Sequence, residues 1–347
     1  MPEGAKVWPL IGQERAVAWL EQSLKQGRVS HAYLFLGPPH VGKTSLAICL
    51  AQALNCQSPV SPCGQCSPCR RIAAGKHADV QIIKLLKDPK DDKDAQEISI
   101  EQIKDLQQHA NLPPYEGSHK VFIITEAERL SPEASNRLLK TLEEPPPHVA
   151  IILLASAEER LLTTVISRCH RIELRPVPAR QLEKALIGRE GMEAELAKRL
   201  AHLAAGCPGL ALSPETRKNL LDERPQRLAD FLNLDGAGNV ERFNFAAKLA
   251  ERFSKQRASV EDELKLWLGW WRDLLLTKAG LKDSVVNIDL GTELEGRVQA
   301  LSLSQISGFL SNLGQAVRQL EQNANPRLVL EVLMLNLPRL SLAQERR

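Results

Sequence analysis

The chain has 347 residues, 25% of them charged and 43% hydrophobic, which is the balance of a globular protein with room for two or three domains. Its formal net charge of +3 is too small to indicate nucleic acid by itself. No apolar run approaches the roughly 20 residues that span a bilayer, and residues 1–4 lack the features of a secretory signal. We therefore expect a cytoplasmic protein with no membrane partner.

Strands and helices alternate in the first half of the chain. Helical character is expected over 44–51, 99–110 and 131–143. Short apolar runs predict strands at 32–36, 80–83, 120–124, 150–154 and 171–174. This order predicts an α/β domain with a mainly parallel sheet covered on both faces. The polar stretch 87–94 predicts a mobile loop.

The second half is expected to be helical. We predict an α/β domain over 1–176, a small helical domain over 177–235 and an all-helical domain over 240–347, with a linker at 235–239. Helix breaks are expected at Gly188, Gly191 and 206–209. Long helices are expected at 261–280, 302–322 and 325–337. Trp267, Trp270 and Trp271 have helical spacing, which favours core packing over base stacking.

Residues 37–44 match the phosphate-binding pattern G-x-x-x-x-G-K-[ST] in full, between an expected strand and an expected helix. Glycines let backbone N–H groups surround phosphate oxygens at a helix N-terminus; an ordinary glycine-rich turn is the alternative. Lys43 is expected to reach the β- and γ-phosphates, and the Thr44 hydroxyl to ligate Mg²⁺. The sequence predicts ATP or ADP with Mg²⁺, bound by Gly37, Pro38, Pro39, His40, Val41, Gly42, Lys43, Thr44 and Ser45, with Thr125 nearby.

Four cysteines begin 12 residues after this loop, with the spacing C-x6-C-x2-C-x2-C. Thiolates at these intervals can close tetrahedrally on one Zn²⁺, and a full set of four ligands favours a structural site. Free buried thiols or a redox pair are the alternative. The predicted zinc ligands are Cys56, Cys63, Cys66 and Cys69, whereas Cys49, Cys169 and Cys207 are expected to be packing residues.

The expected strand 120–124 ends in Thr125-Glu126, where phosphate-loop ATPases usually carry Asp-Glu. A threonine cannot supply the metal-directed charge, so Mg²⁺ would be held less firmly. Glu126 can act as the base that polarises water, or it can be a solvated carboxylate at a strand end. The sequence therefore predicts nucleotide binding without efficient turnover.

These residues together resemble the subunits of bacterial sliding-clamp loaders, which are AAA+ ATPases, over most of the chain. The resemblance implies a RecA-like P-loop domain with an inserted zinc module at about 56–69, a helical lid and a helical collar for oligomerisation. The stretches that carry it are 11–13, 31–35, the cysteine module, 77–80, 136–146, 167–169 and 325–339.

Two branches of this family compete, the ATP-hydrolysing motor (gamma/tau) and the stator (delta prime). Thr125, the stretch 98–117 and an end near the collar favour delta prime, while the intact P-loop keeps the motor open. Leu210 stands near the position of a motor sensor arginine, and Ser156 near the first-sensor position. A zinc-bearing scaffold or DNA-binding module with a vestigial P-loop is the third possibility.

The resemblance implies that this chain serves chemistry in trans. Arg168 is expected to project into the ATP site of a neighbouring motor subunit, although an isolated arginine of this kind would more often form a surface salt bridge. The implied protein is an accessory subunit of the DNA polymerase III holoenzyme, in a nucleoid-associated replisome. Its implied partners are the motor and delta subunits, the sliding clamp indirectly, and primed DNA. Arg137 and Lys140 share a helix face that could meet phosphates, or be merely solvated.

Overall fold

The computed structural model describes residues 8–86 and 97–339, so the expectations for residues 1–4 and for the 87–94 loop lie outside it. The chain divides into two compact units. The first comprises Met1–Ala185 with Gly206–Gly209, and the second Leu186–Ala205 with Leu210–Arg347. The three-part division expected from the sequence stays a prediction. Among the described residues, no helix combines the length and apolarity needed to cross a membrane.

The first unit is built on a five-stranded sheet in the order β2-β3-β4-β1-β5, and every strand pairing is parallel. The strands β1, β3 and β4 are buried along their whole length, which is why they appear in the sequence as continuous apolar runs. The expected strands are thus confirmed, with bounds β1 (Ala32–Leu36), β2 (Val80–Ile83), β3 (Lys120–Ile124), β4 (Val149–Ala155) and β5 (His170–Glu173).

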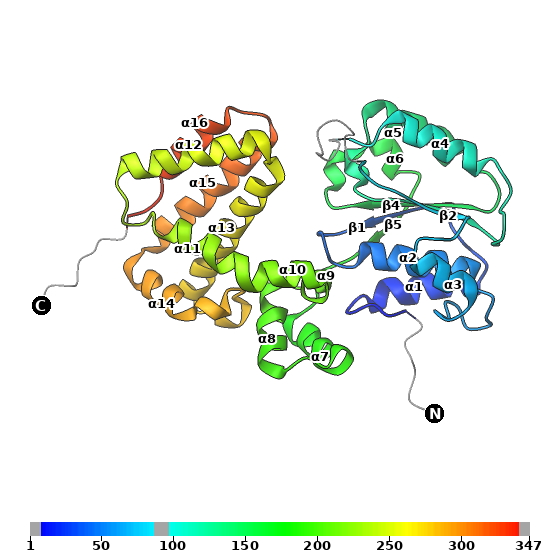
Figure 1. Ribbon diagram of the computed structural model, residues 1–347, viewed down its shortest axis with the longest axis horizontal. Helices are drawn as coiled ribbons and strands as arrows, with labels where there is room; N and C mark the ends of the chain where they lie inside the picture. The colour runs from blue at the N-terminus through cyan, green and yellow to red at the C-terminus, as the bar shows by residue number, and fades with distance from the viewer. Residues whose placement is uncertain (1–7, 87–96, 340–347) are drawn as a thin grey trace, which may run out of the picture. The chain divides into compact units, whose positions relative to one another are not determined.

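Helices cover both faces of this sheet (Figure 1). One face carries α1 (Glu14–Lys25), α2 (Lys43–Asn55) and α3 (Ser67–Ala73), and the other carries α4 (Ile100–Ala110), α5 (Pro132–Glu143) and α6 (Thr163–Ile166). Short 3₁₀ turns, η1 (Ala127–Arg129) and η2 (Glu158–Arg160), follow β3 and β4. Because all strands run in parallel, the segments after β1, β3 and β4 meet at one edge of the sheet.

The second unit is helical, as expected. One expected break is wrong: α7 runs through Gly188 without interruption, since a single helical glycine costs only about 1 kcal/mol. Its elements, with the helices that flank the division, are α7 (Ala179–Glu190), α8 (Ala194–Leu203), α9 (Pro208–Leu212), α10 (Pro214–Lys218), the π-helical turn η3 (Asn219–Glu223), α11 (Arg224–Leu232), α12 (Asn239–Lys255), α13 (Arg257–Lys278), η4 (Lys282–Ser284), η5 (Ile288–Leu290), α14 (Gly291–Ala300), α15 (Leu303–Glu321) and α16 (Pro326–Leu335).

Tryptophans fill the core of this unit. Trp267 stacks on Phe231 with 4.2 Å between ring centroids, and Trp270 and Trp271 are also buried, which confirms the expected packing role. The expected linker, 235–239, overlaps the turn between α11 and α12 and reaches the first residue of α12. Because Phe231 of α11 and Ala246 of α12 belong to the same hydrophobic cluster, this core continues across the expected linker.

Candidate functional site

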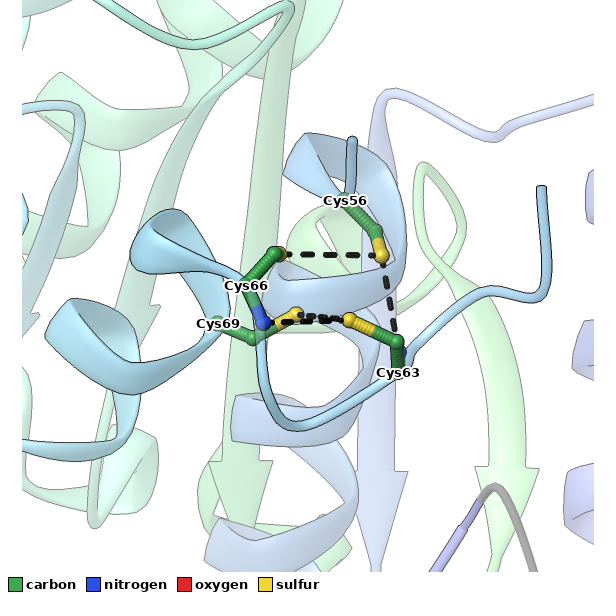
Figure 2. A group of neighbouring side chains, drawn as sticks. All are labelled: Cys56, Cys63, Cys66 and Cys69. Atoms are coloured by element: carbon green, nitrogen blue, oxygen red, sulfur yellow. Dashed lines mark hydrogen bonds between the residues drawn. The ribbon is translucent and has the colours of Figure 1, made fainter. Parts of the chain in front are cut away.

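The four predicted metal ligands converge between the end of α2 and the first turn of α3, in the segment 56–69, hereafter the cysteine knob (Figure 2). Their sulfur atoms all lie within 4.8 Å of one another, and none is in a disulfide. The Sγ atoms of Cys56 and Cys66 are 3.9 Å apart, and those of Cys63 and Cys69 are 4.0 Å apart. Four thiolates at 2.3 Å from a tetrahedral Zn²⁺ would lie about 3.8 Å apart, so the knob fits zinc.

Backbone N–H groups of the cysteine knob point at its sulfur atoms. Cys56 Sγ accepts from the N–H groups of Ser58 and Cys63, each at 3.4 Å, and Cys63 Sγ accepts from Cys66 N–H at 3.3 Å. The N–H groups of Cys66 and Gln65 lower the pKa of Cys63 to about 6, which favours the thiolate that a metal requires. The turn at Gly64 has φ of 68°, which suits glycine.

Polar contacts fasten the cysteine knob to the amino edge of the sheet. The Gln52 side-chain amide donates to the carbonyl of Cys69 at 2.8 Å, and the backbone N–H of His119 donates to Asn55 Oδ1 at 2.9 Å. Asp79 is buried and accepts three backbone N–H bonds from residues 115–117, at 2.7–2.8 Å. In that turn Glu116 forms an ion pair with Arg71 of α3. Only the resemblance had drawn attention to Asp79, and the sequence alone gave no sign of its three donors.

The predicted phosphate loop lies between β1 and α2. Gly37 and Gly42 have φ of 147° and 115°, and a Cβ at Gly37 would come within 2.3 Å of the Leu174 carbonyl oxygen, so both positions need glycine. Val41 is buried, whereas Pro39, His40, Thr44 and Ser45 are exposed. The loop therefore presents its backbone and the start of α2 to solvent, as phosphate binding requires.

Lys43 is folded back over this loop. Its ammonium donates to the carbonyls of Gly37 and Pro38, the latter at 2.9 Å, and to Ser156 Oγ at 3.1 Å. Burial lowers the pKa of Lys43, and the negative charge of Glu128 opposes that shift. Ser156 follows β4, so the structure brings the expected first-sensor residue to the phosphate loop.

At the end of β3, Thr125 supplies no carboxylate, and the charge of Glu126 acts on Lys43 more weakly than that of Glu128 does. The Thr125 hydroxyl donates to the Ile83 carbonyl at 3.2 Å, and Glu126 lies in the left-handed region with φ of 50°. The Glu126 side chain is 51% exposed and pairs with Arg129 at 3.2 Å. A carboxylate that the sequence reasoning missed, Glu128 of η1, instead accepts the backbone N–H of Ser156 at 3.0 Å.

Arg168 lies at the surface, two residues after α6. One guanidinium nitrogen is 2.7 Å from Glu143 Oε1 at the end of α5, and another donates to the Thr164 carbonyl at 2.9 Å. The Arg168 side chain remains 35% exposed. In this chain, Arg168 therefore forms a surface ion pair of the common kind, and its side chain remains partly exposed to solvent.

Arg137 and Lys140 do share a surface. They line a cavity of about 420 Å³ between α4 and α5, together with Lys104. Gln107 of α4 joins the two helices, since its amide accepts from Arg137 Nε at 2.6 Å and donates to Thr141 Oγ1 at 2.7 Å. The other thiols are packing residues, since burial raises the pKa of Cys49 to about 11 and that of Cys169 to about 12, and Cys207 is buried.

Comparison with known families identifies the family of this chain. A family model described as "DNA polymerase III, delta subunit" matches residues 12–178, and one described as "DNA polymerase III, delta subunit, C terminal" matches residues 219–339. The chain belongs to the family of DNA polymerase III clamp-loader subunits, of the delta prime and gamma/tau type. The expected family and its α/β-plus-helical fold are thereby confirmed.

Members of both branches of this clamp-loader family are similar to the chain. Subunit delta' of Bacillus subtilis is 28% identical over 94% of this chain and 96% of that protein. Subunit tau of B. subtilis is 30% identical over 93% of this chain, and tau of Escherichia coli is 37% identical over 51% of it. The chain spans only 60% and 26% of these two tau proteins. A solved gamma subunit-related protein from Thermotoga maritima is remotely similar, with 18% identity and a TM-score of 0.42 over 92% of this chain and 98% of that one.

Proposed function

We propose that this chain is the stator, delta prime, of a clamp loader that places the sliding clamp on primed DNA. In this proposal it binds ATP or ADP with Mg²⁺ at residues 37–45, turns nucleotide over weakly or not at all, and acts on a neighbour's ATP site through Arg168. The proposal draws support from the delta' relative, which matches over nearly the full length of both chains.

One observation carries the choice of stator over motor, namely the fate of Thr125. Its hydroxyl is engaged by the Ile83 carbonyl, and it has no charge to direct at Mg²⁺. Glu126 is 51% exposed and pairs with Arg129, so it would have to leave this ion pair to act as a base toward water. In our proposal, therefore, neither position supports efficient hydrolysis.

Nucleotide binding does not require the carboxylate and the base that hydrolysis requires, and the phosphate loop has the groups for binding. When bound, Mg²⁺ would supply positive charge that neutralises the phosphates. The chain's own part is to surround the phosphates with the N–H groups of residues 37–44, to redirect the Lys43 ammonium from the loop carbonyls onto phosphate, and to offer the exposed Thr44 hydroxyl to the metal.

Arg168 is the group that we assign to chemistry in trans. A guanidinium placed on a transferring phosphoryl group stabilises charge in the transition state, and such fingers contribute roughly 10³–10⁵ in rate. The exposed Arg168 side chain is held by an ion pair that a stronger anion could replace, since exposed pairs of this kind contribute at most about 1 kcal/mol. A motor subunit's nucleotide is such an anion.

Zinc and DNA complete the proposal. The cysteine knob would hold one structural Zn²⁺ through Cys56, Cys63, Cys66 and Cys69, a full set of ligands that leaves no position for substrate. The motor and delta subunits are the proposed protein partners.

The cavity lined by Lys104, Arg137 and Lys140 would contact DNA phosphates in the assembled loader, with the salt dependence that phosphate contacts confer.

The decisive experiment is Arg168→Ala in a loader reconstituted with motor and delta subunits. We expect DNA- and clamp-stimulated ATP hydrolysis to fall at least tenfold while the complex still assembles by size-exclusion chromatography, because only the group in trans is lost. Arg175→Ala is the matched control, since Arg175 is also an exposed, ion-paired arginine. Unchanged hydrolysis in the Arg168 variant would refute the finger.

The two alternatives give different results with the isolated chain. A motor subunit would hydrolyse ATP steadily, and Lys43→Ala would abolish the activity. A zinc-bearing scaffold or DNA-binding module with a vestigial loop would bind no labelled ATP in equilibrium dialysis. The stator binds nucleotide through Lys43 and shows little turnover.

A further inference from the structure

The carboxyl edge of the sheet holds a carboxylate with no role in the family pattern quoted above. Glu128 lies in η1, two residues beyond the end of the Thr125-Glu126 pair. Its Oε1 accepts the Ser156 backbone N–H at 3.0 Å, so the side chain turns toward the segment after β4. Its Oε2 is buried, and no hydrogen-bond partner for it exists within the described part of the chain.

This carboxylate lies beside the cation of the phosphate loop. Ser156 joins the two, since its backbone N–H donates to Glu128 while its hydroxyl is 3.1 Å from Lys43 Nζ. Glu128 is also the carboxylate with the largest electrostatic effect on Lys43. A buried carboxylate oxygen without a donor costs free energy, and a cation at the loop would remove that cost.

We propose that Glu128 is the carboxylate that makes nucleotide binding at this phosphate loop dependent on Mg²⁺, in place of the acidic residue absent at Thr125. The inference rests on the proposed function, because it requires that the loop bind nucleotide. Glu128 would help to position the metal. It would not activate water, so weak turnover is still expected.

Removing the charge of Glu128 should change nucleotide affinity both without and with Mg²⁺, and both changes should reduce the ratio of the two dissociation constants. Without Mg²⁺, the negative charge of Glu128 repels the triphosphate and partly offsets Lys43, so affinity is low. With Mg²⁺, the cation neutralises both the phosphates and the carboxylate, so affinity is high. Removing the charge at Glu128 should therefore strengthen metal-free binding and weaken metal-dependent binding, and both changes shrink the ratio of the two dissociation constants.

The test is a fluorescence titration of the full-length chain with a fluorescently labelled ATP, once with Mg²⁺ and once with EDTA. Zinc must stay bound in both arms, so zinc content is measured after each titration. We expect Glu128→Gln to reduce the ratio of the EDTA dissociation constant to the Mg²⁺ dissociation constant roughly 10- to 100-fold, the usual effect of losing a group that supports a metal. Glu128→Asp retains the charge and should keep most of the ratio.

Three further proteins keep the result interpretable. Glu159→Gln is the matched control, because Glu159 is an exposed glutamate three residues after Ser156. A wild-type ratio in Glu128→Gln would overturn the proposal, and so would a collapse of the ratio in Glu126→Gln alone. Lys43→Ala distinguishes failure of the whole nucleotide site from failure of the Glu128 role alone. If neither this variant nor the wild type binds nucleotide, the proposed nucleotide site is wrong, and the role of Glu128 is wrong with it.

Discussion

The cysteine knob and the carboxyl edge of the sheet are both candidate ion sites, but they are assembled in opposite ways. The knob draws all four ligands from 14 consecutive residues, 56–69, and its sulfur atoms already lie close to tetrahedral spacing. The carboxyl edge draws Lys43, Glu128 and Ser156 from three separate segments. The elements α3, β2, α4 and β3 lie between the first and second, and α5 and β4 lie between the second and third, so only the parallel sheet brings them together.

This difference decides what each region can tolerate. A metal site made from one short segment depends on its own ligands, and the rest of the chain only fixes where it sits. A site made from strand ends depends on strand order and register, so a residue can be lost at one position and its charge supplied from another. In our proposal, Thr125 and Glu128 are such a pair.

The largest expected effect comes from breaking the cysteine knob at one ligand. Cys63→Ser should remove bound zinc, since three thiolates hold zinc far less tightly than four, and it should lower the unfolding temperature. The roughly 10–16 kcal/mol that structural zinc contributes to small zinc fingers is the upper bound for the loss of stability. Zinc is measured by inductively coupled plasma mass spectrometry, and unfolding by calorimetry.

The control for Cys63→Ser is Cys49→Ala, which removes a buried thiol outside the knob. It should keep full zinc content. If Cys63→Ser retained zinc with wild-type affinity, the knob would not be a four-thiolate site, and the contrast between local and assembled sites would fail.

An intermediate effect is expected where the knob is attached to the sheet. Asp79→Asn should reduce the free energy of unfolding by about 2 kcal/mol, because a buried carboxylate that accepts three backbone N–H groups is replaced by an amide that repels one of them. Zinc content should stay at the wild-type level. Asp105→Asn, an exposed change on α4, is the control and should have little effect.

The same substitution has a pH signature. Burial acts to raise the pKa of Asp79, but the three N–H donors and His77 outweigh it and hold the pKa below the usual 3.8. A carboxyl with a depressed folded pKa contributes stability above its unfolded pKa and loses it as the pH falls through the folded one. The difference between wild type and Asp79→Asn should therefore shrink below about pH 4 in chemical denaturation. A constant difference down to pH 2 would contradict this account.

The smallest effect is expected from the ion pair of Glu143 and Arg168. An exposed pair is worth at most about 1 kcal/mol, so Glu143→Gln should raise the ATPase rate of the reconstituted loader no more than about fivefold, by freeing the arginine. The gain should vanish at high salt, because screening already weakens the pair. Glu133→Gln on α5 is the control. A fall to the level of Arg168→Ala would show instead that Glu143 positions the finger.

Sequence reasoning located most of the fold, the cysteine knob and the phosphate loop, but not the carboxylate beside Lys43. The five strands appeared as apolar runs because a parallel sheet covered on both faces is buried throughout, and the cysteine spacing identified the knob. The break expected at Gly188 was wrong, since a single glycine need not end a helix. Sequence reasoning missed Glu128 and did not explain Asp79. Nothing in the neighbouring residues distinguishes a glutamate in a 3₁₀ turn, or an aspartate before a strand, from a solvated carboxylate.

The sequence by itself predicted the phosphate loop with its two required glycines and the four cysteines of the knob, and a resemblance over most of the chain predicted the family. The loop and the knob each lie within a few consecutive residues, so spacing is enough to predict them. The tertiary structure decided which carboxylate faces Lys43, which turn holds the knob to the sheet, and that Arg168 is paired with Glu143. Those contacts form only when strands align and helices pack. They join residues that are far apart along the chain, so no local sequence pattern indicates them.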